Sequence, residues 1–190
     1  MNVILASQSP RRRELLGLFG FPFTVKVADI DETMGFGTPE EEVAQVSRKK
    51  AEAIERAAED VVIAADTIVV CRDYILGKPA DDEEAFEMLS LLSGRPHQVM
   101  TGLTVLRGDK CITCTEITDV YFRPLTPGEI RRYIATGDPR DKAGSYGIQS
   151  GASIFVEKIY GDYFNVVGLP VCRLSKILKE IAPELMEEMV

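Results

Sequence analysis

The chain has 190 residues, with 22 lysines and arginines against 30 aspartates and glutamates, and 45% of its residues are hydrophobic. That length and composition suit one globular domain over residues 1–190 and exclude disordered, collagen-like and disulfide-rich classes. A formal net charge of −8 argues against a nucleic-acid partner, because general nucleic-acid binders carry a basic surface.

Membrane and export signals are not apparent in the sequence. No apolar run approaches the roughly 20 residues that a membrane-spanning helix needs. Residues 1–6 lack the basic region and the long apolar core of a signal peptide. We therefore expect a cytoplasmic protein without a membrane partner.

Two sequence patterns predict helix starts. Ser9-Pro10 combines a preferred N-cap residue with proline in the first turn. Thr38-Pro39-Glu40-Glu41 predicts a capping box at the start of a helix that runs to about residue 59. The first helix should bury Leu15, Leu16, Leu18 and Phe19.

Helical and strand patterns alternate along the rest of the chain, which predicts a mixed α/β fold. Further helices are expected over residues 81–93, from Thr126-Pro127 to about 137, and over 174–181. The apolar stripe of the first of these is Ala85, Met88, Leu89 and Leu92. Strands are expected over residues 3–6, 23–28, 144–156 and 163–167, with a strand pair over 61–70 and a hairpin formed by 102–107 and 111–122.

Asp66 interrupts the apolar run 61–70, where an unpaired charge is costly to bury. It is either an aspartate in a turn between two strands or a carboxylate that faces a cleft. In a cleft it could bind a divalent metal or accept a proton from water.

Three arginines, at positions 11–13, follow Ser7-Gln8-Ser9-Pro10 in the first turn of the predicted helix. The partial positive charge of a helix N-terminus disfavours cations unless an anion binds there as well. The pattern indicates either a solvated basic turn or a phosphate site.

Lys50 lies four residues after Val46 and four before Ile54, on the apolar side of its predicted helix. Its ammonium group either extends to solvent along the helix surface or reaches into a cleft. The glycine-rich tract 141–152 allows a ligand to approach the backbone closely, and Gln149 within it offers a donor and an acceptor.

Cys111 and Cys114 have the spacing of half a zinc site, but no second pair exists and His97 is the only histidine. Residues three apart on a strand face opposite sides, so we interpret these cysteines as structural. His97 is interpreted as a hydrogen-bonded structural residue.

Several tracts together resemble the Maf family of nucleoside triphosphate pyrophosphatases over nearly the whole chain. They are Ser7-x-Ser9-Pro10-Arg11-Arg12-x-Glu14-Leu15-Leu16, Ala65-Asp66-Thr67, Gly77-Lys78-Pro79, Leu92-Ser93-Gly94-x-x-His97, Asp141-Lys142-Ala143-Gly144-x-Tyr146-Gly147-Ile148-Gln149 and Val167-Gly168-Leu169-Pro170. The resemblance implies an elongated twisted sheet flanked by helices, with two lobes around a cleft, as in inosine-triphosphate pyrophosphatases. It also implies a homodimer.

The resemblance further implies hydrolysis of a nucleoside triphosphate to the monophosphate and pyrophosphate, with Mg²⁺ or Mn²⁺ as cofactor. Such hydrolysis removes unwanted nucleotides from the cellular pool. Asp66 resembles the catalytic carboxylate, and Glu32 resembles a second acidic residue near the metal. The residues that resemble the family's phosphate-binding set are Ser7, Ser9, Arg12, Lys50 and Lys78.

Substrate choice follows from three further positions. Arg11, Thr67 and Gln149 resemble the branch that acts on dTTP and UTP, and a neutral amide matches the acceptor and donor edge of uracil or thymine. The alternatives are a 7-methyl-GTP pyrophosphatase, an ITP or XTP pyrophosphatase, and a non-catalytic nucleotide sensor that regulates cell division.

Overall fold

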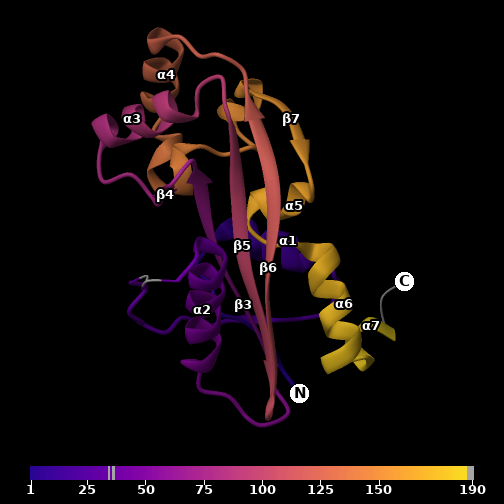
Figure 1. Ribbon diagram of the computed structural model, residues 1–190. Coiled ribbons are helices and arrows are strands. Elements are labelled where there is room, and N and C mark those ends of the chain that lie inside the picture. Colours follow the sequence, from indigo (N-terminus) through magenta and orange to yellow (C-terminus); the bar gives the residue numbers. More distant parts are fainter. Residues whose placement is uncertain (34, 36, 188–190) are drawn as a thin grey trace. The chain divides into compact units, whose positions relative to one another are not determined.

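The computed structural model describes residues 1–33, 35 and 37–187, and these form a mixed α/β structure (Figure 1). The described strands form one seven-stranded sheet in the order β2-β1-β3-β5-β6-β7, with β4 paired to β3. β1 is parallel to β2 and β3, whereas the β3–β4 and β6–β7 pairs are antiparallel. The strands are β1 (Val3–Leu5), β2 (Thr24–Val25), β3 (Val61–Cys71), β4 (Tyr74–Leu76), β5 (Pro96–Arg107), β6 (Lys110–Phe122) and β7 (Val156–Tyr160).

Helices flank this sheet, and none among the described residues is long and apolar enough to cross a membrane. The α-helices are α1 (Pro10–Gly17), α2 (Pro39–Glu52), α3 (Asp82–Leu92), α4 (Pro127–Ile134), α5 (Tyr163–Val167), α6 (Val171–Ile181) and α7 (Glu184–Glu187). Three 3₁₀ turns are η1 (Asp138–Asp141), η2 (Ala143–Ser145) and η3 (Gly151–Phe155).

The chain divides into two compact units. Unit 1 comprises Met1–Asp66, Thr101–Glu116 and Gly168–Val190, and unit 2 comprises Thr67–Met100 and Ile117–Val167. The long strands β3, β5 and β6 each contribute residues to both units. The boundary in β3 falls between Asp66 and Thr67, so these neighbours belong to different units.

In unit 1, helix α2 packs directly on strand β5. A Cβ on Gly102 would lie 2.2 Å from the carbonyl oxygen of Val43, so only glycine permits this approach. Alternate residues of β1 and β3 face the same cluster because side chains on a strand alternate between its two faces. The cluster comprises Ile4, Ala6, Ala51, Ile54, Val62, Ala64 and Leu106.

In unit 2, helix α3 supplies much of the core. Ala85, Met88, Leu89 and Leu92 form its buried stripe, as the sequence pattern predicts. They belong to a cluster with the aromatic side chains of Phe122, Tyr133, Tyr146 and Phe155. This core supports the segment after α4, which carries the glycine-rich tract.

The expected capping residues are confirmed. The side chain of Ser9 accepts a hydrogen bond from the Arg12 backbone N–H, and Thr38 and Glu41 form the reciprocal capping box. The helix α2 is shorter than predicted and ends at Glu52. The chain then turns toward β3, where the Asp60 carboxylate accepts from the backbone N–H groups of Ala57 and Asn2.

Five other expectations are wrong. β3 is one continuous strand rather than a pair, and the strand expected over residues 23–28 covers only Thr24–Val25. Leu18 is 62% exposed and lies outside the buried face of α1. Residues 144–156 form no continuous strand because Gly144 and Ser145 adopt φ values of 67° and 62°, so the strand β7 begins only at Val156.

Residues 163–167 form helix α5 instead of the expected strand. The Asp162 carboxylate accepts a hydrogen bond from the Phe164 backbone N–H at 2.8 Å, which caps the first turn. This local cap outweighs the strand preference of the aromatic and β-branched residues that follow.

Candidate active site

A lysine held between two carboxylates forms the centre of the site in unit 1. Lys50 in α2 donates a hydrogen bond to Asp66 Oδ1 in β3 at 2.7 Å, and its Nζ lies 3.0 Å from Glu32 Oε1. The Lys50 and Asp66 side chains are only 16% and 14% exposed, whereas that of Glu32 is 58% exposed. The Asp66 carboxylate is paired, so β3 continues through it without a turn. Asp66 is therefore not a turn residue, and the Lys50 ammonium group points to Asp66 instead of extending to solvent.

Arg12 extends from the first turn of α1 toward the same carboxylates. Its Nε donates to the carbonyl oxygen of Gly168 at 2.8 Å, and its guanidinium also donates to Ser7 Oγ at 3.3 Å. Burial lowers the pKa of Arg12, while the negative charge of Asp66 opposes that shift. An arginine guanidinium is not deprotonated in proteins, so Arg12 remains a cation despite this shift. Unit 1 thus places a half-buried permanent cation near Asp66.

Ser7 and Ser9 shape the turn before α1. Ser7 is 8% exposed, and its Oγ accepts from the backbone N–H of Ser9 at 3.2 Å. Ser9 Oγ accepts from the Arg12 N–H, so the two hydroxyls and the arginine belong to one local network. Arg11 is half-buried beside Arg12, and Arg13 is exposed.

The remaining expected site residues, Thr67, Lys78 and Gln149, lie in unit 2. Thr67 is half-buried in β3, whereas Lys78 and Gln149 are exposed. The loops of Lys78 and Gln149 are linked because the Gly144 N–H donates to the Gly77 carbonyl oxygen at 3.0 Å. A Cβ on Gly144 would lie within 2.8 Å of the Val69 side chain, so the glycine-rich tract packs closely on β3.

The acidic residues fit a metal that completes its coordination with substrate. Among the described residues, no group of three or more His, Cys, Asp or Glu side chains could hold a metal ion. Asp66 and Glu32 nevertheless meet at one ammonium group. Mg²⁺ commonly uses only one or two protein carboxylates together with phosphate oxygens and water. The donor set therefore fits Mg²⁺ bound together with a phosphate ligand.

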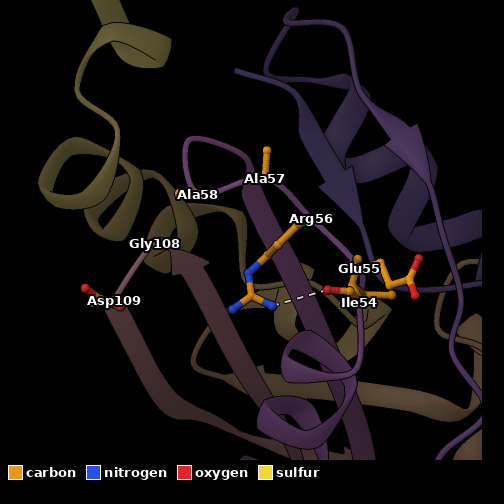
Figure 2. A pocket seen from close by; sticks show the side chains of 7 residues that line it. All are labelled: Ile54, Glu55, Arg56, Ala57, Ala58, Gly108 and Asp109. Atoms are coloured by element: carbon orange, nitrogen blue, oxygen red, sulfur yellow. Dashed lines mark hydrogen bonds between the residues drawn. The ribbon is translucent and has the colours of Figure 1, made fainter.

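A shallow pocket elsewhere in unit 1 contains none of the expected site residues (Figure 2). The segment between α2 and β3 and the β5–β6 turn line it. Arg56, the longest side chain there, donates a hydrogen bond to the Ile54 carbonyl oxygen at 3.2 Å. The full lining is Ile54, Glu55, Arg56, Ala57, Ala58, Gly108 and Asp109.

His97 is a buried, hydrogen-bonded residue, as expected from the sequence, and the cysteines are unbridged. Cys111 and Cys114 are unbridged residues of β6, three positions apart on the strand. His97 is 3% exposed, and its Nε2 lies 2.8 Å from the Tyr146 hydroxyl oxygen. Burial lowers the pKa of His97 to about 4.

A contact that the sequence patterns did not single out is the one between Arg12 and the Gly168 carbonyl. Gly168 lies 156 positions away from Arg12 along the chain. Gly168 belongs to the tract Val167-Gly168-Leu169-Pro170, which contributes to the family resemblance but does not indicate a contact with Arg12. Asp138, which binds the segment around Gln149, was also missed.

The family model described as Maf-like protein matches residues 2–181. The chain belongs to the Maf family. It is 50% identical to a dTTP/UTP pyrophosphatase of Bacillus cereus strain ATCC 10987, over 94% of this chain and 89% of that relative. It is 49% identical to a dTTP/UTP pyrophosphatase of Bacillus anthracis, over 94% of this chain and 95% of that relative.

Among solved structures, a HAM1 protein from Coxiella burnetii aligns with a TM-score of 0.48 at 15% identity. The alignment covers 95% of this chain and 99% of that protein. The Maf family model and the two Bacillus relatives cover both units of the chain, so the family assignment applies to the residues of both.

Proposed function

We propose that this Maf protein hydrolyses dTTP and UTP to the nucleoside monophosphate and pyrophosphate. The names of the Bacillus relatives support this substrate class. The observation that carries the proposal is the cluster of Lys50, Asp66 and Glu32, with Arg12 nearby. A triphosphate requires cations for its oxygens, and its hydrolysis requires a base or a metal ligand; this cluster supplies both.

The cations would bind and orient the triphosphate. Arg12, Lys50 and Lys78 would neutralise phosphate oxygens, and Ser7 and Ser9 would shape the turn that receives them. Negative charge spreads over the transferring phosphoryl group in the transition state, so fixed positive charges accelerate the reaction. Any nucleoside triphosphate can use these contacts equally.

Asp66 would act on the attacking water. Water attacks the α-phosphorus, a new P–O bond forms, and the bond to the bridging oxygen breaks as pyrophosphate leaves. The proton of the water passes to the Asp66 carboxylate. Asp66 and Glu32 would also hold Mg²⁺ or Mn²⁺, and the bound metal would supply additional charge stabilisation for the phosphates.

Arg11, Thr67 and Gln149 would select the base. The Gln149 amide offers one donor and one acceptor, which complement the carbonyl and N–H groups of uracil and thymine. A carboxylate at that position would instead suit a cationic base such as 7-methylguanine. The neutral amide therefore favours dTTP and UTP over 7-methyl-GTP.

We further propose that the two units form one functional domain over residues 1–190, because three strands of the sheet contribute to both. A homodimer is expected for this domain. Size-exclusion chromatography with light scattering measures the mass that tests this expectation.

Pyrophosphate release tests the proposed activity. The wild-type chain with Mg²⁺ should turn over dTTP and UTP faster than ITP, XTP, GTP or 7-methyl-GTP. Asp66→Asn keeps the side-chain shape but removes the charge, and should lower kcat by about 100-fold or more. The matched control is Asp109→Asn, an exposed turn aspartate in unit 1, which should retain full activity.

Two results would contradict the proposal. Stoichiometric binding of dTTP without turnover by the wild-type chain would indicate a nucleotide sensor instead of an enzyme. Full activity of the Asp66→Asn variant would remove Asp66 from the catalytic role.

A further inference from the structure

The segment that carries Gln149 has no regular strand or α-helix to hold it. Between α4 and β7 the chain forms only the three 3₁₀ turns η1, η2 and η3. The Ser150 N–H donates to the Gly147 carbonyl oxygen at 3.2 Å, which closes a turn over residues 147–150. Gln149 is an exposed residue inside this turn. Its direction therefore depends on whatever fixes Gly147 and Ser150.

The Asp138 carboxylate binds three side chains around this turn. Oδ2 accepts hydrogen bonds from the Tyr133 hydroxyl at 2.5 Å and from the Ser150 hydroxyl. Oδ1 accepts from Lys142 Nζ at 3.0 Å. The Asp138 and Lys142 side chains are 24% and 12% exposed, so solvent screens these contacts less than it screens a surface pair.

Asp138 reaches both ends of the turn. It binds Ser150 directly, and it orients the Tyr133 hydroxyl, whose oxygen accepts from the Gly147 N–H at 3.1 Å. Side chains also pack tightly against Gly147, because an added Cβ would lie 2.7 Å from both Lys142 Cε and Ser150 Oγ. Neither end of the turn can shift without breaking one of these contacts.

The charge of Asp138 suits this role. Burial opposes ionisation of the carboxyl group, but hydrogen bonds from Ser150, Tyr133 and Lys142 outweigh it and lower the pKa of Asp138. The group is therefore ionised at neutral pH and can only accept hydrogen bonds. Both hydroxyls must then direct their hydrogens toward it, which fixes the Tyr133 oxygen as the acceptor for Gly147.

We propose that Asp138 is a positioning residue for base recognition, which fixes the turn 147–150 and thereby aims the Gln149 amide. The inference rests on the proposed function, in which Gln149 pairs with uracil or thymine. A hydrogen bond to the base is lost when the amide moves by about 1 Å, so a fixed turn contributes to selectivity. The proposed phosphate contacts of Arg12 and Lys50 come from helices α1 and α2, which lie outside this segment.

The test measures base selectivity, defined as kcat/KM for UTP divided by kcat/KM for GTP. Asp138→Asn replaces the carboxylate with an amide of the same shape, and should lower this ratio by about 10-fold. The matched control is Asp82→Asn, which removes a carboxylate 3.6 Å from the Arg140 guanidinium of η1, in an exposed pair. That variant should keep the wild-type ratio.

A double-mutant cycle separates positioning from general damage. If Asp138 acts through Gln149, Asp138→Asn should cause no further fall in the ratio when Gln149→Ala is already present. Ser150→Ala removes a single donor and should lower the ratio by less than Asp138→Asn does. A thermal melt shows whether Asp138→Asn folds. If it does not fold, the ratio measured for Ser150→Ala alone tests whether the turn contributes to base selectivity.

Two outcomes would overturn the inference alone. One is a wild-type ratio in the folded Asp138→Asn and Ser150→Ala variants, and the other is an equal fall with and without Gln149. A wild-type chain without preference for UTP and dTTP would instead overturn the proposed function, and this inference with it.

Discussion

At the scale of single residues, the site depends on charges that are unfavourable alone and favourable together. Lys50 would be costly to bury in α2, and Asp66 would be costly in the apolar strand β3. The two side chains meet at 2.7 Å, and Glu32 approaches the same ammonium group at 3.0 Å. Lys50 and Asp66 were recognisable from the sequence because each interrupts an apolar pattern, whereas Glu32 was indicated only by the family resemblance. Their pairing was not recognisable, because they lie on different elements.

Gln149→Glu separates base recognition from phosphate binding. A carboxylate cannot donate to a base carbonyl, so kcat/KM for dTTP and UTP should fall by about 10-fold or more, while GTP is less affected. Combining it with Arg11→Trp should raise activity on 7-methyl-GTP relative to UTP, because an aromatic ring stacks on a cationic base. Steady-state kinetics on the five substrates UTP, dTTP, CTP, GTP and 7-methyl-GTP measure this.

The comparison variant is Arg12→Lys. It should lower kcat/KM by a similar factor for every triphosphate, because the phosphates that Arg12 would contact are common to all of them. An equal loss on all substrates for Gln149→Glu would show that Gln149 does not recognise the base.

At the scale of elements, local signals predicted helices better than they predicted loops. The starts of α1, α2 and α4 follow Ser9-Pro10, Thr38-Pro39 and Thr126-Pro127, where a side-chain oxygen caps the first turn. The buried stripe of α3 follows from apolar residues repeated at the spacing of an α-helix. The strand expected over residues 144–156 failed because left-handed conformations at Gly144 and Ser145 depend on packing against Val69 and Met88, which are distant in sequence.

Gly102→Ala tests how closely α2 must approach β5. The new Cβ would lie 2.2 Å from the Val43 carbonyl oxygen and 2.9 Å from Ala44 Cα, which are backbone atoms that cannot rotate away. We expect the free energy of unfolding to fall by about 3 kcal/mol, at the upper end of overpacking costs. Urea denaturation followed by circular dichroism measures it.

The control for that variant is Gly17→Ala, because no atom lies within 4 Å of the added Cβ and Gly17 is the last residue of helix α1. It should leave stability unchanged or raise it by up to about 1 kcal/mol, since alanine is the better helix former. Wild-type stability for Gly102→Ala would mean that α2 does not rest on β5 at this point.

At the scale of the whole molecule, the mixed α/β class follows from the alternation of patterns, but the order of strands does not. β1 pairs in parallel with β2 and β3, and the pairing of β3 with β5 joins strands separated by α3. Such pairings join segments far apart in sequence, and single-sequence periodicity carries no information on them. Only the β5–β6 hairpin, with Gly108 at its turn, was accessible from local sequence.

The free energy of unfolding should depend on pH through one buried residue, His97. His97 is the only histidine, and burial lowers its pKa to about 4, whereas an exposed histidine titrates near 6.5. Between these values the unfolded chain binds a proton that the folded chain does not. The free energy of unfolding therefore falls as the pH falls from about 6.5 to about 4, and this group has no further effect below that range. Between pH 7.5 and pH 5 the loss should be about 2 kcal/mol.

His97→Gln removes this titration while keeping a polar side chain near the Tyr146 hydroxyl, which lies 2.8 Å from His97 Nε2. Urea denaturation at pH 7.5 and pH 5 should show a smaller loss of stability in this variant than in the wild type.

Tyr146→Phe is the matched control, because it removes the hydroxyl partner but retains the buried imidazole and its pH dependence. The carboxylates with lowered pKa, such as Asp60 and Glu129, lose their stabilising charge only at lower pH and are the same in all three proteins. Equal losses in wild type and His97→Gln would mean that folding does not lower the pKa of His97.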